Sequence, residues 1–176
     1  MKMIYFLSVI LMSVLLSGCH HEDETEPQTP SSLVFRVSAN PAPNDATDLD
    51  EPVIFTGNDV LWFNETTNEI RFKNNMSEKQ KITSSPYQRI LFYIGDEYLF
   101  SAQIIVSDIH SRIYSSLVFF YDPIENRFYI QDGYPKMSDY YNDPDEQKIR
   151  DENMKKIGNE WNKFINQLKQ EDRCKK

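Results

Sequence analysis

Several residue types on which common protein classes depend are scarce in this chain. It has two cysteines, three histidines and five glycines among 176 residues. Two cysteines form one disulfide at most, which excludes a small disulfide-stabilised scaffold. The glycines are all isolated, so there is no glycine-rich loop to hold a phosphate group, and we expect no cofactor. Acidic residues outnumber basic ones by 27 to 19, and no basic stripe is present, so we expect no nucleic-acid partner.

Long apolar runs are scarce too, and the one that is present lies at the N-terminus. Residues 3–16 form an apolar stretch of 14 residues behind Lys2, which is typical of a secretory signal peptide and shorter than the roughly 20 residues of a membrane span. It ends in Leu-Ser-Gly-Cys at residues 16–19, which resembles the lipobox of bacterial lipoproteins. The resemblance implies removal of residues 1–18, lipidation of Cys19 and attachment to a membrane through that lipid. An ordinary signal peptide or a short membrane anchor is the alternative.

The segment that follows Cys19 is strongly acidic. Residues 20–51 contain eight acidic residues and one basic residue, whereas residues 52–176 contain 19 and 17. Residues 19–32 offer no apolar side chain to bury, which predicts a solvated tether behind the lipidated cysteine. The acidic cluster resembles the short export signal that carries some lipoproteins of gut Gram-negative bacteria to the outer face of the outer membrane. A plain charged tether is the alternative.

Residues 33–176 are predicted to form a single α+β domain, interrupted by an acidic, proline-rich loop at residues 40–52. Short runs rich in Ile, Val, Phe and Tyr alternate with polar turns, a pattern typical of strands joined in hairpins. The predicted strands are at residues 33–37, 60–63, 70–73, 89–94, 98–106, 113–121 and 127–131. Taken in series, these hairpins predict an antiparallel β-meander of about six to seven strands, as an open sheet or a partial barrel.

Side-chain alternation predicts which faces of the sheet are buried. The even-numbered residues from Tyr98 to Val106 share one side of their strand and are expected to face the core. Residues 117–121 are apolar at every position, which predicts a central strand covered on both faces. An element outside the sheet must therefore cover the second face.

One long C-terminal helix packed on the sheet is the predicted cover. Asp143 as N-cap, Pro144 as first helical residue and Glu146 as capping-box acid predict its start. The apolar residues at helical spacing predict one buried stripe, made of Ile149, Ile157, Trp161, Phe164, Ile165 and Leu168. Gly158 indicates a close approach to the sheet, and Glu146 with Arg150 is interpreted as a pair on the solvent side.

No pattern of catalytic or metal-ligating residues emerges. His20 and His21 lie on a tether without fixed geometry, so we expect no metal site. Asp108 and His110 are a fragment of acid–base machinery, but no nucleophile motif such as Gly-x-Ser-x-Gly accompanies them, and a plain loop is the preferred interpretation. We therefore expect that the protein is not an enzyme. Cys174, the third residue from the end, is predicted to be a frayed thiol.

Tyrosines and polar residues gather between the last predicted strand and the helix. Aromatic rings can stack on a sugar or peptide while amides and carboxylates take hydrogen bonds. The candidate ligand-binding residues are Tyr129, Gln131, Asp132, Tyr134, Asp139, Tyr140 and Tyr141. The alternative is that these tyrosines pack the crossing from strand to helix, with their hydroxyl groups in water.

Four segments of the chain are similar to segments of one family, the small uncharacterised lipoproteins of gut Gram-negative bacteria. The segments are Trp62-Phe63-Asn64, Thr67-x-Glu69-Ile70-x-Phe72, residues 89–94 and Trp161-x-x-Phe164-Ile165. That family supplies no activity to carry over. Together with the lipobox, the resemblance predicts a non-catalytic envelope lipoprotein at the outer membrane that binds a glycan, a peptide or an envelope protein. If the acidic cluster acts as an export signal, the protein is exposed at the cell surface. A small hydrolase of the secretory compartment and a structural subunit of an envelope assembly are the alternatives.

Overall fold

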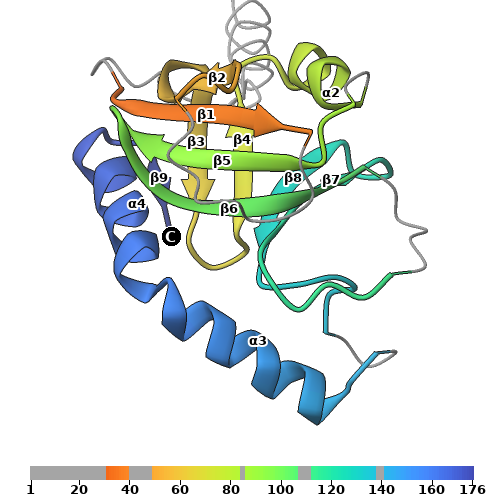
Figure 1. The fold of residues 1–176 in the computed structure, drawn as a ribbon. Helices are drawn as coiled ribbons and strands as arrows, with labels where there is room; N and C mark the ends of the chain where they lie inside the picture. The colour runs from red at the N-terminus through yellow and green to blue at the C-terminus, as the bar shows by residue number, and fades with distance from the viewer. Residues whose placement is uncertain (1–30, 40–48, 84–85, 107–111, 138–140) are drawn as a thin grey trace, which may run out of the picture.

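The computed structural model describes residues 31–39, 49–83, 86–106, 112–137 and 141–176 (Figure 1). Within these ranges it contains one nine-stranded sheet and three α-helices, so the fold is α+β, as predicted. None of these helices has both the length and the apolar character that a bilayer span requires. The predicted signal peptide, Cys19, the pair His20–His21 and the pair Asp108 and His110 lie outside the described residues, as do most of the tether and of the acidic loop.

The strands form a single sheet in the order β2-β1-β5-β6-β7-β8-β4-β3-β9. Their bounds are β1 Leu33–Ser38, β2 Val53–Thr56, β3 Val60–Asn64, β4 Glu69–Phe72, β5 Arg89–Ile94, β6 Glu97–Ile105, β7 Val118–Asp122, β8 Arg127–Gln131 and β9 Cys174–Lys175. A short 3-10 helix, η1 (Gly57–Asp59), joins β2 to β3, and helix α2 (Asn75–Thr83) follows β4. Strands β1, β5 and β6 cross β3 and β4 at a steep angle, so the sheet curls into a half-barrel (Figure 1).

The three predicted hairpins are present, because local turn chemistry encodes them. The pairs β3–β4, β5–β6 and β7–β8 are all antiparallel. Their turns contain Asn68, Gly95 and Asn126 at φ values of 58°, 57° and 56°. Glycine adopts this left-handed region freely, and asparagine does so more readily than most residues.

The predicted order of these hairpins is wrong, and the sheet is mixed rather than purely antiparallel. Strand β1 pairs with β5, and β4 pairs with β8, so sheet neighbours are often distant in the chain. Strands β6 and β7 are parallel, with Gln103 opposite Val118. Strands β3 and β9 are also parallel, with Phe63 opposite Cys174. The count of nine strands exceeds the predicted six to seven because β2 and β9 were not predicted; β2 directly follows the acidic, proline-rich loop, and β9 has only two residues.

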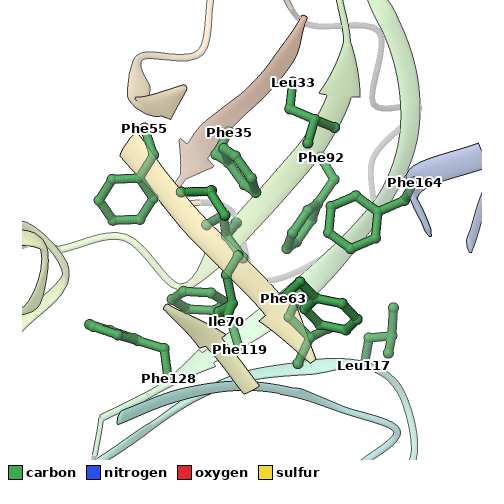
Figure 2. Packing of buried hydrophobic residues seen from close by; sticks show 14 of the residues in the cluster. Leu33, Phe35, Phe55, Phe63, Ile70, Phe92, Leu117, Phe119, Phe128 and Phe164 are labelled. Carbon is green, nitrogen blue, oxygen red and sulfur yellow. The ribbon is translucent and has the colours of Figure 1, made fainter. Parts of the chain in front are cut away.

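Phenylalanine side chains fill the inside of the half-barrel. Figure 2 shows rings from both parts of the curled sheet pointing into one interior, with Phe164 entering from helix α4 (Gly158–Gln170). The Phe164 ring lies 5.7 Å from Phe63, 5.6 Å from Phe92 and 5.6 Å from Phe100, each time edge to face. Aromatic rings prefer this geometry. Helix α4 therefore packs on the sheet, and the predicted buried stripe is confirmed for this part of the C-terminal segment.

The C-terminal segment is two helices rather than the predicted single one. Helix α3 (Pro144–Lys156) and helix α4 meet at Ile157, whose φ of −105° and ψ of 11° lie outside the helical range. Ile149, predicted to be buried, is 47% exposed, so the apolar stripe does not extend into α3. Gly158 lies in open space and not against the sheet, which contradicts the predicted close approach.

Helix α3 packs only Met154 against the main core of the described residues and is otherwise held by polar contacts. Asp143 caps it as predicted, because its Oδ1 accepts from the backbone N–H groups of Asp145 and Glu146 at 3.0 and 3.2 Å. The Glu146–Arg150 pair is buried and not on the solvent side as predicted, since the two residues are 9% and 0% exposed. Arg150 Nε donates to Glu146 Oε1 at 2.8 Å, and Ser115 Oγ donates to Oε2 at 2.9 Å. The Glu146 carboxylate thus serves these two groups in place of the predicted capping box.

Strand β7 is covered on both faces, as predicted, but not by the predicted element. Val118 and Phe120 belong to a second apolar cluster with Ile105 and Tyr134, on the face opposite the main core. An isolated antiparallel bridge between Tyr114 and Tyr134 brings this cover over the strand. The C-terminal helix packs on the other face, because its apolar residues belong to the main core.

The end of the chain is ordered against the sheet, so the prediction of a frayed thiol is wrong. Cys174 is half-buried in β9, and its Sγ donates to Glu65 Oε1 at 3.2 Å. Arg173 is 1% exposed and donates from Nη1 to the carbonyl oxygen of Val60 at 2.6 Å. Its Nε donates to Glu171 Oε2 at 3.2 Å. These contacts tie the last residues to β3.

We expect the Cys174 thiol to react slowly with alkylating reagents. Burial and the hydrogen bond to Glu65 raise the pKa of Cys174 to about 11. At pH 8 roughly one such thiol in a thousand is ionised, against about a quarter for a thiol of ordinary pKa. Iodoacetamide labelling of the Cys174 peptide, followed by mass spectrometry, is expected to be about 100-fold slower than in the unfolded chain and to accelerate as the pH rises toward 11.

The variant Glu65→Gln removes the negative charge beside the thiol and is expected to speed labelling several-fold at pH 8. Lys163→Met, which changes a charge elsewhere on α4 where Lys163 pairs with Glu97, serves as the matched control. Equal labelling rates in the folded and unfolded chain contradict the assignment.

Candidate ligand-binding groove

The alternation of β8 divides its side chains between two environments. Phe128 and Ile130 point into the main core, whereas Tyr129 and Gln131 lie on the opposite face and are half-buried. Strand β8 is flanked by β7 on one side and β4 on the other, so this face lies within the sheet and not at its edge. Figure 1 places β7 and β8 on the side of the sheet away from α4.

A groove of about 420 Å³ opens over this face. This volume lies in the range of roughly 300–1,000 Å³ that is typical of small-molecule sites. The lining residues come from the β3–β4 turn, from β7, β8 and the turn that joins them, and from the segment after β8. They are Thr67, Phe120, Asp122, Glu125, Tyr129, Gln131, Tyr134, Pro135 and Lys136.

Aromatic rings form the apolar floor of the groove. The Phe120 ring lies 5.7 Å from the Tyr134 ring and stacks at 6.5 Å from the Tyr129 ring. Phe120 and Tyr134 are 9% and 7% exposed, so both rings are fixed in the second cluster and present little surface. The half-buried Tyr129 ring is the aromatic surface that remains open to a ligand.

A charged network fixes the Tyr129 hydroxyl. Its O–H donates to Glu125 Oε2 at 2.7 Å, and Arg127 Nη1 lies 3.6 Å from that oxygen and 3.6 Å from Glu69 Oε2. Burial, with a contribution from the hydrogen bond to Glu125, raises the pKa of Tyr129 to about 12. The phenol therefore keeps its proton at neutral pH, and its oxygen accepts a hydrogen bond from Arg127.

The turn between β7 and β8 sets the position of Glu125. Asp122 Oδ1 accepts from the backbone N–H groups of Ile124 and Glu125 at 2.8 and 3.0 Å. An aspartate side chain that bonds the backbone two residues ahead is a common way to close a turn. The same residues that end the strand thus place two carboxylates beside the groove.

Three of the seven predicted ligand-binding residues, Tyr129, Gln131 and Tyr134, line the groove. Asp132 does not line it, and its Oδ1 lies 4.0 Å from Arg150 Nη1. Tyr141 is half-buried next to the start of α3 and does not line the groove either. Asp139 and Tyr140 lie outside the described residues. The predicted cluster is therefore only partly a single site.

The sequence analysis missed six of the lining residues. Phe120 is directly opposite Tyr129 in the β7–β8 register, and Asp122 and Glu125 belong to the predicted turn between those strands. The predicted five-residue turn at residues 122–126 would place Phe120 opposite Phe128. Asp122 instead pairs with Arg127, and this shift of one residue brings Phe120 opposite Tyr129. Thr67 comes from a different hairpin, which no local pattern connects to β8.

The groove contains polar groups but no recognisable catalytic set. No group of three or more His, Cys, Asp or Glu side chains is arranged for a metal ion in the part of the chain that the structure describes. Both carboxylates of the groove already accept hydrogen bonds, Asp122 from the turn backbone and Glu125 from Tyr129. The arrangement is suited to accepting hydrogen bonds from a ligand that rests on an aromatic ring.

Comparison with known proteins assigns no family to this chain. No family model, no curated protein and no solved structure matches it. The function must therefore be inferred from the chemistry of the side chains that line the groove.

Proposed function

We propose that this protein is a lipid-anchored lipoprotein of the bacterial cell envelope that binds a saccharide in the groove over β8 and does not catalyse a reaction. The observation that carries the proposal is the combination, in one groove of about 420 Å³, of the half-buried Tyr129 ring with the polar side chains of Gln131, Asp122 and Glu125. A ring surface that stacks on a sugar and polar groups that bond its hydroxyls are the two features such recognition needs.

A saccharide fits this groove better than an extended peptide. Extended peptides commonly bind by adding a strand to an open sheet edge, where main-chain hydrogen bonds supply the affinity. Strand β8 has neighbours on both sides, so its backbone groups already serve β7 and β4. Side chains, and not a strand edge, form the groove, which favours a ligand recognised through its hydroxyl groups.

The hydrogen-bond partners of the two groove carboxylates, Glu125 and Asp122, favour binding over hydrolysis. Glycoside hydrolysis generally needs a protonated acid and an ionised partner on either side of the scissile bond. Glu125 is half-exposed, accepts from Tyr129 and lies 3.6 Å from the Arg127 cation, so its carboxylate is already engaged by two partners. The Asp122 carboxylate already accepts a hydrogen bond from the backbone of the turn. This supports a non-catalytic role.

The sequence supplies the membrane anchor in this proposal, through lipid on Cys19 and the acidic tether behind it. The tether joins the domain at a fixed point. Ser31 N donates to Asn58 Oδ1 at 3.0 Å, and Ser32 N donates to Glu171 Oε1 at 3.1 Å. The segment that precedes β1 is thus attached to η1 and to the end of α4, while the groove lies over β7 and β8.

The proposal is tested by glycan-array screening of the full-length, detergent-solubilised protein, followed by calorimetry with each glycan that binds. Tyr129→Ala is expected to weaken binding about tenfold, since loss of one stacked ring corresponds to roughly 1.4 kcal/mol. Tyr98→Ala is the matched control, because Tyr98 is also half-buried but packs edge to face against Tyr93, on the β5–β6 hairpin. Absence of binding to any glycan, or equal losses in both variants, contradicts the proposal.

A further inference from the structure

We infer that the groove selects neutral, hydroxyl-rich saccharides and rejects acidic ones. This inference rests on the proposed function and adds the class of ligand to it. It follows from the hydrogen-bonding character and the charge of the groove-lining side chains.

One of the groove-lining residues, Gln131, carries a buried acceptor without a partner in the described part of the chain. Oε1 of Gln131 is shielded from solvent and has no hydrogen-bond partner among the described residues. A shielded acceptor without a donor is unfavourable, and a donor that reaches it gains a strong hydrogen bond. A sugar hydroxyl can supply this donor, whereas an ionised carboxylate or sulfate group cannot.

The carboxylates beside it are also acceptors. The Tyr129 hydroxyl donates to Glu125 and accepts from Arg127, so it has no proton left for an anionic ligand. The carboxylates of Asp122 and Glu125 accept hydrogen bonds and cannot donate them when ionised. Gln131 Oε1 and these two carboxylates therefore favour a ligand that carries many O–H donors.

The charge of the groove points to the same ligand class. Two carboxylates line it, against one ammonium group, that of the exposed Lys136. Arg127 lies beside the groove, but its guanidinium already faces Glu69 and Glu125. An acidic sugar stacked on Tyr129 would lie close to the carboxylates of Asp122 and Glu125 at the β7–β8 turn. Repulsion between these like charges opposes binding.

The test measures affinities of the full-length protein in detergent by calorimetry at one ionic strength. The probes are cellohexaose, maltohexaose and mannohexaose as neutral ligands, and hexagalacturonate and a hyaluronan hexasaccharide as acidic ones. At least one neutral probe is expected to bind at least tenfold more tightly than both acidic probes. Gln131→Leu is expected to weaken the neutral ligand about tenfold, because the shielded acceptor is removed.

Glu125→Gln tests the rejection of acidic ligands directly. It keeps the size of the side chain but removes its charge, and it is expected to strengthen binding of the acidic probes at least threefold. Asp96→Asn, in the exposed turn between β5 and β6, makes the same change of net charge away from the groove and is expected to alter acidic binding by less than 1.5-fold. Thermal melting of each variant verifies that it is folded.

The outcomes separate the inference from the proposed function. If an acidic probe binds as tightly as the neutral ones, the inference is overturned while saccharide binding stands. If Glu125→Gln and Asp96→Asn strengthen acidic binding equally, the selection comes from overall charge and the assignment to the groove is overturned. If no saccharide binds in either experiment, both fall together.

Discussion

Replacing Arg150 by methionine is expected to lower the free energy of unfolding by about 3–5 kcal/mol, the typical cost of removing one partner of a buried ion pair. Arg150 is fully buried, and its Nη1 donates to the carbonyl oxygen of Pro135 at 2.8 Å in addition to the Nε bond to Glu146. Methionine fills part of the space but leaves the Glu146 carboxylate buried without its cation. The segment after β8, which carries Tyr134 and Pro135, loses its link to α3.

The measurement is urea unfolding followed by tryptophan fluorescence. The double variant Glu146→Leu with Arg150→Met removes both charges and is expected to be less destabilised than Arg150→Met alone, because no buried charge remains unpaired. Lys148→Met, an exposed position on the same helix, is expected to change the free energy of unfolding by less than about 0.5 kcal/mol. A loss below about 1 kcal/mol for Arg150→Met contradicts the assignment of a buried pair.

Arg150 also explains why residue 133 is a glycine. A Cβ atom on residue 133 would lie 2.4 Å from Arg150 Nε and 2.5 Å from the carbonyl oxygen of Tyr114. The absence of a side chain at Gly133 therefore makes room for the guanidinium. Nothing in the local sequence shows this, because the two residues meet only after α3 has packed beside the strand.

What the sequence predicted correctly depends on short-range interactions. Each hairpin turn and the helix cap involve residues only a few positions apart, so the local sequence predicts them. These features are the turns at Asn68, Gly95 and Asn126 and the cap at Asp143. The pairing of β6 with β7 in parallel is set by contacts across the whole domain. A series of hairpins therefore predicted the strands and not their order.

The alternation prediction for β6 is confirmed for Phe100, Ala102 and Ile104, which belong to or pack on the main core. It is wrong for Val106, which is 39% exposed, and for Tyr98, which lies beyond a local irregularity. The register shifts between Phe92 and Tyr93, where Phe92 is opposite Phe100 and Tyr93 is opposite Tyr98, so Leu99 is an extra residue in the strand. Leu99 and Phe100 are both buried as a result. Such a bulge inserts one residue and reverses the faces beyond it, which a strict period of two cannot foresee.

The candidate site was predictable to the extent that it lies on one strand. Tyr129 and Gln131 alternate along β8, and Tyr134 follows closely, so their clustering was visible in the sequence. Asp139, Tyr140 and Tyr141 were added because they are close in the chain, although of these three only Tyr141 belongs to the described residues, and it does not line the groove. Thr67 was missed because the pairing of β4 with β8 brings it there.

The second large effect is expected for Phe164→Ala, which should lower the free energy of unfolding by about 3–5 kcal/mol. The ring is fully buried and contacts the rings of Phe63, Phe92 and Phe100, so it joins α4 to both parts of the curled sheet (Figure 2). Truncation to alanine removes these contacts and leaves a cavity where the helix closes the half-barrel.

Ile149→Ala is the matched control, because the sequence placed Ile149 and Phe164 on one apolar stripe while the structure separates them. Ile149 is 47% exposed on α3, and its truncation is expected to cost less than about 1 kcal/mol. Urea unfolding of the two variants therefore tests whether the buried apolar stripe of α4 extends to Ile149. Comparable losses at both positions contradict the exposure of Ile149, since they require that this side chain is buried too.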